Sequence, residues 1–244
     1  MARGDLKGRA PERLLAWFAV HGRDLPWRRT RDPYAILVSE VMLQQTQAAR
    51  VVPRYLAWLK RWPTAEDLAA APTADVLRAW QGLGYNRRSV NLQRAAREVA
   101  ENGWPEDLTL LPGVGRYTAD AVACFAFGRP VLPVDINVRR VLERTRARFD
   151  GACAQALMDL GATVCIARIP RCGECPLAEL CPSRGRRFEP VRRQGSFEGS
   201  FRQRRATALR TLLEGGDPAD DEAVAALAAD GLVRLEEGSA SLPD

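Results

Sequence analysis

The segment Leu111-Pro112-Gly113-Val114-Gly115 interrupts a sequence that otherwise has mostly helical character. Two glycines around one apolar residue allow a tight turn, and its backbone can approach a partner closely because no Cβ is in the way. If one helix ends before the turn and another begins after it, the free N–H groups point outward and can bind a phosphate. A plain helix–turn–helix connection with a capping glycine would have the same sequence.

The residues that follow this turn predict two more helices. Arg116, Tyr117 and Thr118 form a polar helix start, and apolar residues continue the helix as far as Phe127. Asp135 comes eighteen residues after Tyr117 and is expected to cap a helix that runs to about Arg146. A carboxylate at the positive end of a helix is held ionised, and it could stabilise a sugar that develops positive charge.

Upstream of the turn, Pro33 predicts the start of a helix that carries Tyr34 to about Ala49. Glu40 lies in an apolar run of this helix, and positions 36, 40, 43, 44 and 47 would share one face. A carboxyl group against apolar walls has a raised pKa, which suits a general acid near neutral pH. The alternative is a glutamate on a solvated face, which is the commoner place for one.

Further helices are predicted at 11–21, 51–61, 66–80 and from residue 86 to about Glu101. A second glycine turn, Gly82-Leu83-Gly84-Tyr85, places an aromatic residue at a loop tip or helix start. Such a side chain could wedge into a DNA base stack, although on this pattern alone a tyrosine that packs on the core is the better explanation.

Four cysteines follow in the pattern C-x6-C-x2-C-x5-C, at Cys165, Cys172, Cys175 and Cys181. Four thiolates at this spacing suit either a zinc site or an iron–sulfur cluster better than four unrelated thiols. Cys124 and Cys153 lie outside the pattern and are expected to be ordinary thiols.

The charge of the chain is unevenly distributed. Residues 1–205 contain 34 Lys and Arg against 21 Asp and Glu, whereas residues 206–244 contain 2 against 9. A basic body suits a polyanion such as nucleic acid. An arginine-rich linker at 182–205 leads to an acidic tail, where helices near 203–214 and 221–229 and a strand pair near 232–242 predict a small winged-helix-like unit that packs on the body.

The N-terminus does not resemble a secretion signal, because Glu12 and Arg13 interrupt any apolar core. No apolar run approaches the length of a membrane span. We therefore expect a protein of the bacterial cytoplasm, associated with the nucleoid, with no membrane partner.

Seven motifs in a fixed order resemble the helix-hairpin-helix DNA glycosylases of the endonuclease III superfamily, and most closely its MutY-type adenine glycosylases. The resemblance covers roughly residues 11–185. The motifs are LPWR (25–28), SEVMLQQTQ (39–47), GLGY (82–85), LPGVGRYTADAV (111–122), VDINVRRVL (134–142), ALMDLGATVC (156–165) and the four-cysteine spacing.

The resemblance implies an all-α fold with two domains and a tail. Residues 1–28 with 133–185 would form the iron–sulfur cluster domain, residues 29–132 the six-helix barrel with the hairpin, and residues 186–244 the basic linker and acidic tail. The four cysteines would then hold a [4Fe–4S] cluster. Only 63 residues follow Cys181, which is too few for the Nudix-like C-terminal domain that is usual in the family.

The resemblance also implies roles for individual residues. Glu40 would protonate adenine, Asp135 would stabilise the cationic sugar, and Tyr117 and Asn137 would orient Asp135. The backbone of the hairpin would bind phosphate, often with an alkali cation. The residues expected to contact the flipped base or the DNA are Leu25, Arg28, Gln44, Gln45, Tyr85, Gly113, Val114, Gly115 and Gln155.

The implied function is base excision repair: removal of adenine opposite 8-oxoguanine or guanine in double-stranded DNA by a monomeric hydrolase. Bifunctional relatives cut the strand with a lysine at the position of Tyr117, and this chain contains only Lys7 and Lys60. We therefore predict a glycosylase without efficient β-lyase activity. Two alternatives remain open: release of thymine or uracil opposite guanine, and a non-catalytic DNA-binding scaffold.

Overall fold

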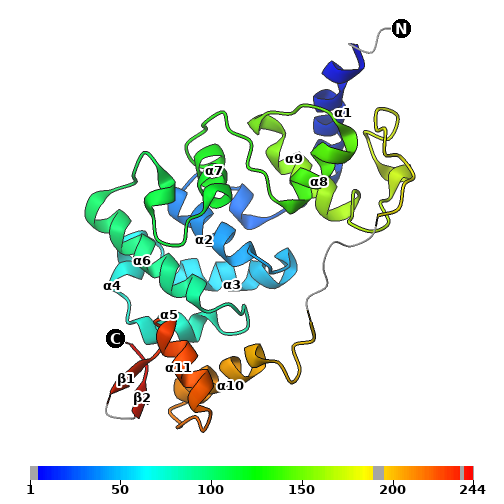
Figure 1. Cartoon of the computed structure of the whole chain (residues 1–244). Helices are drawn as coiled ribbons and strands as arrows, with labels where there is room; N and C mark the ends of the chain where they lie inside the picture. The colour runs from blue at the N-terminus through cyan, green and yellow to red at the C-terminus, as the bar shows by residue number, and fades with distance from the viewer. Residues whose placement is uncertain (1–4, 189–194, 237–238, 244) are drawn as a thin grey trace. The chain divides into compact units, whose positions relative to one another are not determined.

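The computed structural model describes residues 5–188, 195–236 and 239–243. These residues are mainly helical, with one short antiparallel strand pair near the C-terminus (Figure 1), which confirms the predicted all-α class. The elements are α1 (Asp5–His21), α2 (Pro33–Leu43), α3 (Ala48–Arg61), α4 (Ala65–Ala70), α5 (Thr73–Trp80), α6 (Arg87–Asn102), α7 (Arg116–Phe125), α8 (Ile136–Thr145), α9 (Ala154–Thr163), α10 (Phe201–Leu213), α11 (Asp221–Ala229), β1 (Arg234–Glu236) and β2 (Ser239–Ser241).

The described residues divide into two compact units, and each unit is made of two separate stretches. The first unit contains the residues before Asp32 and those from 116 to 188, and the second contains 32–115 and the residues from 195 onward. This division differs from the expected domains, because α7 groups with the first unit and the tail groups with the second. Residues 189–194 of the expected linker lie outside the described part of the chain.

In the first unit, α9 packs against both α1 and α8. Their shared core is aliphatic and continues into the cysteine-containing segment. Its largest fully buried side chains are Leu14, Leu157, Leu160 and Leu177. The helix that begins after Asp135 is therefore held on a rigid support by the helix that precedes the cysteines.

In the second unit, three tryptophans form the centre of the core. The Trp58 ring lies 4.8 Å from the Trp62 ring and 5.5 Å from the Trp80 ring, measured between centroids, and both contacts are edge-on. Edge-on contacts are a favoured arrangement for aromatic pairs. They join α3 to α5 and provide the wall against which α2 packs.

The helix predicted at 66–80 is wrong, because the chain forms two helices, α4 and α5, on either side of Pro72. Proline has no N–H to donate and disfavours helical backbone in the residue before it. The buried amide of Gln93 compensates for the break, since its nitrogen donates to the carbonyl oxygens of Leu68 at 3.3 Å and Ala71 at 2.6 Å.

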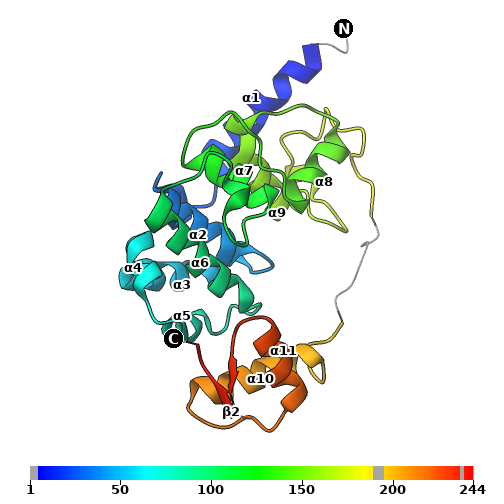
Figure 2. The same ribbon diagram turned by 60° about the vertical axis from the view of Figure 1, so that its left-hand side comes forward.

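The tail has the predicted order of two helices and a strand pair, with Arg234 opposite Ser241 in the antiparallel register. It packs on α5 and α6, as Figures 1 and 2 show, through a core that includes Leu77 and Val90. At its edge, Asp230 forms ion pairs with Arg87 of α6 and Arg205 of α10. The tail is therefore an integral part of the second unit.

Leu209 of α10 is 2% exposed in this shared core, so we expect Leu209→Ala to lower the free energy of unfolding of the second unit by about 2–5 kcal/mol. Leu235 of β1 is 50% exposed, and Leu235→Ala should change it by less than about 0.5 kcal/mol. Urea unfolding of the two variants makes the comparison. Equal stability of both variants would contradict a packed tail.

Candidate functional site

Helix α2 carries Glu40 and is buried at every residue from Tyr34 to Met42. Asp32 caps it by accepting hydrogen bonds from the N–H groups of Tyr34 and Ala35. The Tyr34 hydroxyl donates to the Trp62 carbonyl at 3.0 Å and accepts from the Trp58 indole at 3.2 Å, which fixes the start of the helix in the core. Glu40 itself is only 5% exposed, so it does not lie on a solvated face.

The expected continuation of this helix to Ala49 is wrong. Helix α2 ends at Leu43, Gln44 has extended backbone with ψ of 114°, and Gln45 is left-handed with φ of 56°. Gln44 therefore does not lie one helical turn beyond Glu40 on the same face. The two glutamines belong to a short loop between α2 and α3.

The Gly82–Tyr85 turn separates α5 from α6 and presents one aromatic side chain. Gly82 and Gly84 have φ values of 86° and 71°, and Tyr85 is left-handed with φ of 48°. The Trp80 indole donates to the Gly84 carbonyl at 3.1 Å and so closes the turn onto α5. Tyr85 is 45% exposed, which places part of its ring at the surface.

The hairpin turn at 111–115 has the geometry that its glycines predict. Val114 donates its N–H to the Leu111 carbonyl, and Gly113 has φ of 74°. A Cβ on Gly113 would lie 2.6 Å from the Cβ of Asn91, so the turn touches α6 and only glycine fits there. A Cβ on Gly115 would meet nothing within 4 Å, and α7 begins at the next residue. The backbone of this segment is therefore open to a ligand.

We expect Gly113→Ala to destabilise the protein by at least about 1–3 kcal/mol, because it adds a steric clash to a left-handed backbone. Gly115→Ala is the control for stability, since its methyl group has space and its backbone is not left-handed. Thermal unfolding of both variants tests this. Similar melting temperatures would mean that α6 can move away from the turn at little cost.

Asp135 caps α8, as predicted. One carboxylate oxygen accepts from the Val138 N–H at 2.6 Å, and the other accepts from the Asn137 side-chain amide at 2.9 Å. These two bonds fix the orientation of the half-buried carboxylate. Tyr117, in the first turn of α7, belongs to the same unit and is also half-buried.

Arg140 holds Asn137 in the orientation that lets it donate to Asp135. Its guanidinium donates to the Asn137 side-chain oxygen at 2.8 Å, and also to the carbonyls of Gly161 at 2.7 Å and Cys165 at 2.8 Å. A Cβ on Gly161 would lie 2.8 Å from the Cβ of Asn137, so glycine allows α9 to approach this network. The sequence did not single out Arg140, because two of its three acceptors, Gly161 and Cys165, are brought to it by the tertiary fold.

Arg28 of the Leu25–Arg28 motif is committed to a buried carboxylate. Its guanidinium donates to both oxygens of Asp159, at 2.9 Å and 2.7 Å, and to the Arg23 carbonyl. Burial of Asp159, whose side chain is 0% exposed, favours a raised pKa, but hydrogen bonds from Arg28 and Arg23 outweigh it and lower the pKa. Leu25 is buried nearby in sequence, and Gln155 lies half-buried in α9. Asp159 was missed, although it is the one carboxyl group in the apolar stretch 156–165.

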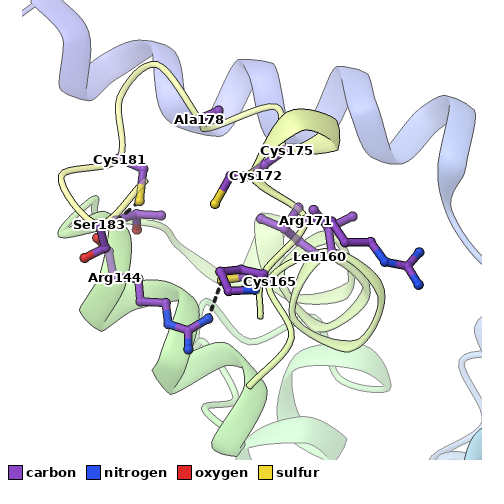
Figure 3. Close-up of a pocket in the computed structure, with 12 residues that line it drawn as sticks. Arg144, Leu160, Cys165, Arg171, Cys172, Cys175, Ala178, Cys181 and Ser183 are labelled. Atoms are coloured by element: carbon purple, nitrogen blue, oxygen red, sulfur yellow. Dashed lines mark hydrogen bonds between the residues drawn. The ribbon is translucent and has the colours of Figure 1, made fainter. Parts of the chain in front are cut away.

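The four predicted cysteines line one pocket in the first unit, and Figure 3 shows their side chains around it. Burial, with a smaller contribution from the nearby thiols of Cys165, Cys181 and Cys172, raises the pKa of the Cys175 thiol to about 11. Among the described residues, no three His, Cys, Asp or Glu side chains converge on a single metal ion. Four cysteine thiols around one pocket are a ligand set for an iron–sulfur cluster.

Arg144 lies beside this pocket and contacts one of the cysteines. Its guanidinium donates to the Cys165 sulfur at 3.5 Å, drawn as a dashed line in Figure 3, and to the carbonyls of Ile166 and Ala167. The ring of Phe188 covers the guanidinium at 3.7 Å from its centroid. A donor to a thiolate stabilises the negative charge that a bound cluster carries. The residues present therefore fit an iron–sulfur cluster.

Comparison with known families identifies the class of protein. Residues 38–155 match the family described as HhH-GPD superfamily base excision DNA repair protein, and residues 165–181 match the iron–sulfur binding domain of endonuclease III. The two matches contain the buried Glu40, the hairpin, the Asp135 network and the cysteine pocket. Their order defines an iron–sulfur DNA glycosylase of the helix-hairpin-helix class.

A relative in Mycobacterium tuberculosis, an adenine DNA glycosylase, is 42% identical to this chain, and the alignment covers 94% of this chain and 92% of the relative. The chain therefore belongs to the adenine DNA glycosylase family of the HhH-GPD superfamily. It is a DNA-binding base excision repair enzyme with a [4Fe–4S] cluster.

Solved structures agree on the fold. A thermostable thymine-DNA glycosylase has 29% identity and a TM-score of 0.67, and the similarity covers 75% of this chain and 98% of the other. Endonuclease III trapped as a covalent intermediate with DNA has 23% identity and a TM-score of 0.63, and the similarity covers 75% of this chain and 96% of the other.

None of the helices in the described residues is both long and apolar enough to cross a bilayer.

Proposed function

We propose that this protein hydrolyses the N-glycosidic bond of adenine mispaired with 8-oxoguanine or guanine in double-stranded DNA. The observation that carries the proposal is a pair of carboxyl groups in contrasting environments: Glu40 is buried within α2, and Asp135 accepts two hydrogen bonds at the start of α8. The name of the Mycobacterium tuberculosis relative supports adenine as the base.

In the proposed reaction, Glu40 donates a proton to the flipped adenine and makes it a neutral leaving group. The bond between base and sugar then breaks, and the electron pair leaves with the adenine. The Asp135 carboxylate stabilises the positive charge that develops on the sugar. Water attacks the sugar carbon and loses a proton, which gives an abasic site and free adenine.

The remaining residues would orient these groups or bind DNA. Asn137, held by Arg140, and Tyr117 would orient Asp135. Leu25, Arg28 and Gln155 would line the base pocket, and Arg28 would be positioned by Asp159. The hairpin backbone at 113–115 would bind a phosphate, with an alkali cation as a further prediction. Gln44 and Tyr85 would enter the base stack near the mispair, and Gln45 would contact the DNA.

The cysteines Cys165, Cys172, Cys175 and Cys181 would hold the cluster. Iron–sulfur clusters supply one-electron redox chemistry. Glycosidic hydrolysis transfers no electrons to an acceptor, so every step above is carried by side chains of the chain and by water. We also expect a monomer located with the nucleoid, because a lesion in a duplex has no two-fold symmetry to match.

The test is single-turnover base release from four duplexes that differ only in the target pair: adenine opposite 8-oxoguanine, adenine opposite guanine, thymine opposite guanine and uracil opposite guanine. Release of adenine, fastest opposite 8-oxoguanine, is the expected result. Release of thymine or uracil alone would establish the alternative to which the 29% identity with the thymine-DNA glycosylase points. Tight binding without release would establish a non-catalytic scaffold.

The enzyme should release the base without cutting the strand. Position 117, where bifunctional relatives have the lysine, is a tyrosine in this chain. The exposed Lys60 is the one lysine whose side chain lies in the described residues. Borohydride reduces the Schiff base of a lyase to a stable adduct, so we expect at most a trace of trapped DNA. A strong adduct that persists in a variant with both Lys7→Ala and Lys60→Ala would refute a monofunctional enzyme.

A further inference from the structure

Arg88 connects the two loops that are expected to enter the base stack. It lies in the first turn of α6, three residues after Tyr85, and its guanidinium donates only to main-chain carbonyls. One terminal nitrogen, Nη1, donates to the last turn of α2 and to the loop that follows it, and the other, Nη2, donates to the glycine turn. The acceptors of Nη1 are Val41 at 2.6 Å, Met42 at 3.3 Å and Gln44 at 2.7 Å, and those of Nη2 are Leu83 at 3.1 Å and Gly84 at 3.0 Å.

These bonds are made next to strained backbone. Within the described residues, left-handed residues other than glycine occur at three positions, and two of them are Gln45 and Tyr85. The Gln44 carbonyl belongs to the peptide group before Gln45, and the Gly84 carbonyl belongs to the peptide group before Tyr85. Arg88 thus holds the peptide plane on the N-terminal side of each strained residue. Such conformations persist only where their surroundings hold them.

The guanidinium is poorly placed to bind a DNA phosphate. Both terminal nitrogens are used, the carbon of the group lies 5.2 Å from the Trp80 ring centroid and 5.7 Å from the Tyr85 ring centroid, and its Nε is buried with no partner in the described residues. Burial lowers the pKa of Arg88 to about 10, so the group remains charged at neutral pH. A buried cation is costly to keep, and here every carbonyl that it binds lies in the glycine turn, in the loop after α2 or in the last turn of α2 that leads into that loop.

We propose that Arg88 is a positioning residue that joins the Gln44–Gln45 loop and the Gly82–Tyr85 turn into one rigid probe of the base stack. The inference rests on the proposed function, in which Gln44 and Tyr85 enter the duplex. Arg88 touches neither base nor sugar. Its loss should therefore impair extrusion of the adenine and leave the steps after extrusion intact.

The experiment compares Arg88→Gln and Arg88→Lys with the wild type on two substrates. One is a fully paired duplex around the adenine:8-oxoguanine pair, and the other is a bubble in which unpaired neighbours leave the adenine unstacked. Unstacking costs a few kcal/mol, so both variants should lose at least about tenfold in single-turnover rate on the duplex and less than about threefold on the bubble. Lysine keeps the charge but cannot bridge both loops with a planar fork.

The matched control is Arg97→Gln, on the same helix, because Arg97 donates to a single carbonyl, that of Ala69 at 3.1 Å. It should behave like the wild type on both substrates. A 2-aminopurine placed beside the adenine reports unstacking independently of catalysis, and its fluorescence rise should be smaller in both Arg88 variants. Arg88→Lys keeps the experiment decisive if Arg88→Gln does not fold.

Equal losses on the duplex and the bubble would overturn the inference, because Arg88 would then act on the fold as a whole or on the chemical step. Wild-type rates and fluorescence in both variants would also overturn it. A wild-type enzyme that releases no adenine from either substrate would overturn the proposed function and this inference together. If the wild type released adenine and both Arg88 variants matched its rates, the inference about Arg88 would fail and the proposed function would stand.

Discussion

Asp135→Asn is expected to slow single-turnover release of adenine by about three orders of magnitude, because the amide cannot stabilise the positively charged sugar. The substitution is nearly isosteric, and asparagine caps helices about as well as aspartate. The bond from the Val138 N–H can therefore persist, and α8 should remain in place. The measurement is the rate of base release at saturating enzyme, together with the affinity for an uncleaved duplex.

Asp150→Asn provides the control for Asp135→Asn. Asp150 also accepts a backbone hydrogen bond at the start of a short helical turn, from the Ala152 N–H at 3.1 Å, and it belongs to the same unit. Its replacement should leave the rate unchanged. If Asp135→Asn kept the wild-type rate while binding DNA normally, the carboxylate would have no part in the reaction.

Glu40→Gln is the second substitution with a large expected effect: a loss of about 10²–10⁴-fold in the rate of adenine release, the usual contribution of a positioned general acid. Glutamine fits the same volume in the buried face of α2 and cannot supply a proton. The substitution should not change the position of α2, because Asp32 caps its start and Arg88 binds carbonyls in its last turn. The rate of adenine release by Glu40→Gln, measured across a pH series, should recover little of its loss as the pH is lowered.

The exposed Glu98 of α6 gives the matched control, since Glu98→Gln removes a carboxyl group from the same unit without touching the core. Its rate should equal that of the wild type. A Glu40→Gln variant that released adenine normally would transfer the role of acid to another group. If it also released thymine or uracil, the specificity would lie outside Glu40.

Elements whose signals are local could be predicted from the sequence. Asp135 caps α8 because its carboxylate accepts a hydrogen bond from the N–H of a residue three positions later. The cysteine spacing likewise predicts a pocket whose members are close in sequence. These features require no knowledge of distant partners.

The errors arose where distant partners or backbone strain decide the structure. Helix α2 has helical periodicity beyond Leu43, yet Arg88, far along the chain, binds the carbonyls at its end and supports a left-handed Gln45. The functions of Arg140 and Asp159 also depend on acceptors and donors that only the fold brings together. The break at Pro72 had a local signal, and the helical pattern on both sides concealed it.

The interleaved order of the two units has a consequence for synthesis on the ribosome. Helix α1 packs against α9, which lies more than 100 residues later in the chain. Helix α1 therefore leaves the exit tunnel long before its partner is made, and residues 32–115 are produced in the interval. The second unit then waits for α10 and α11, which come after the cysteine segment. The first unit cannot complete its folding until residues 32–115 of the second have been translated, so nascent α1 must remain unpaired during that interval without aggregating. Its many charged residues suit that period.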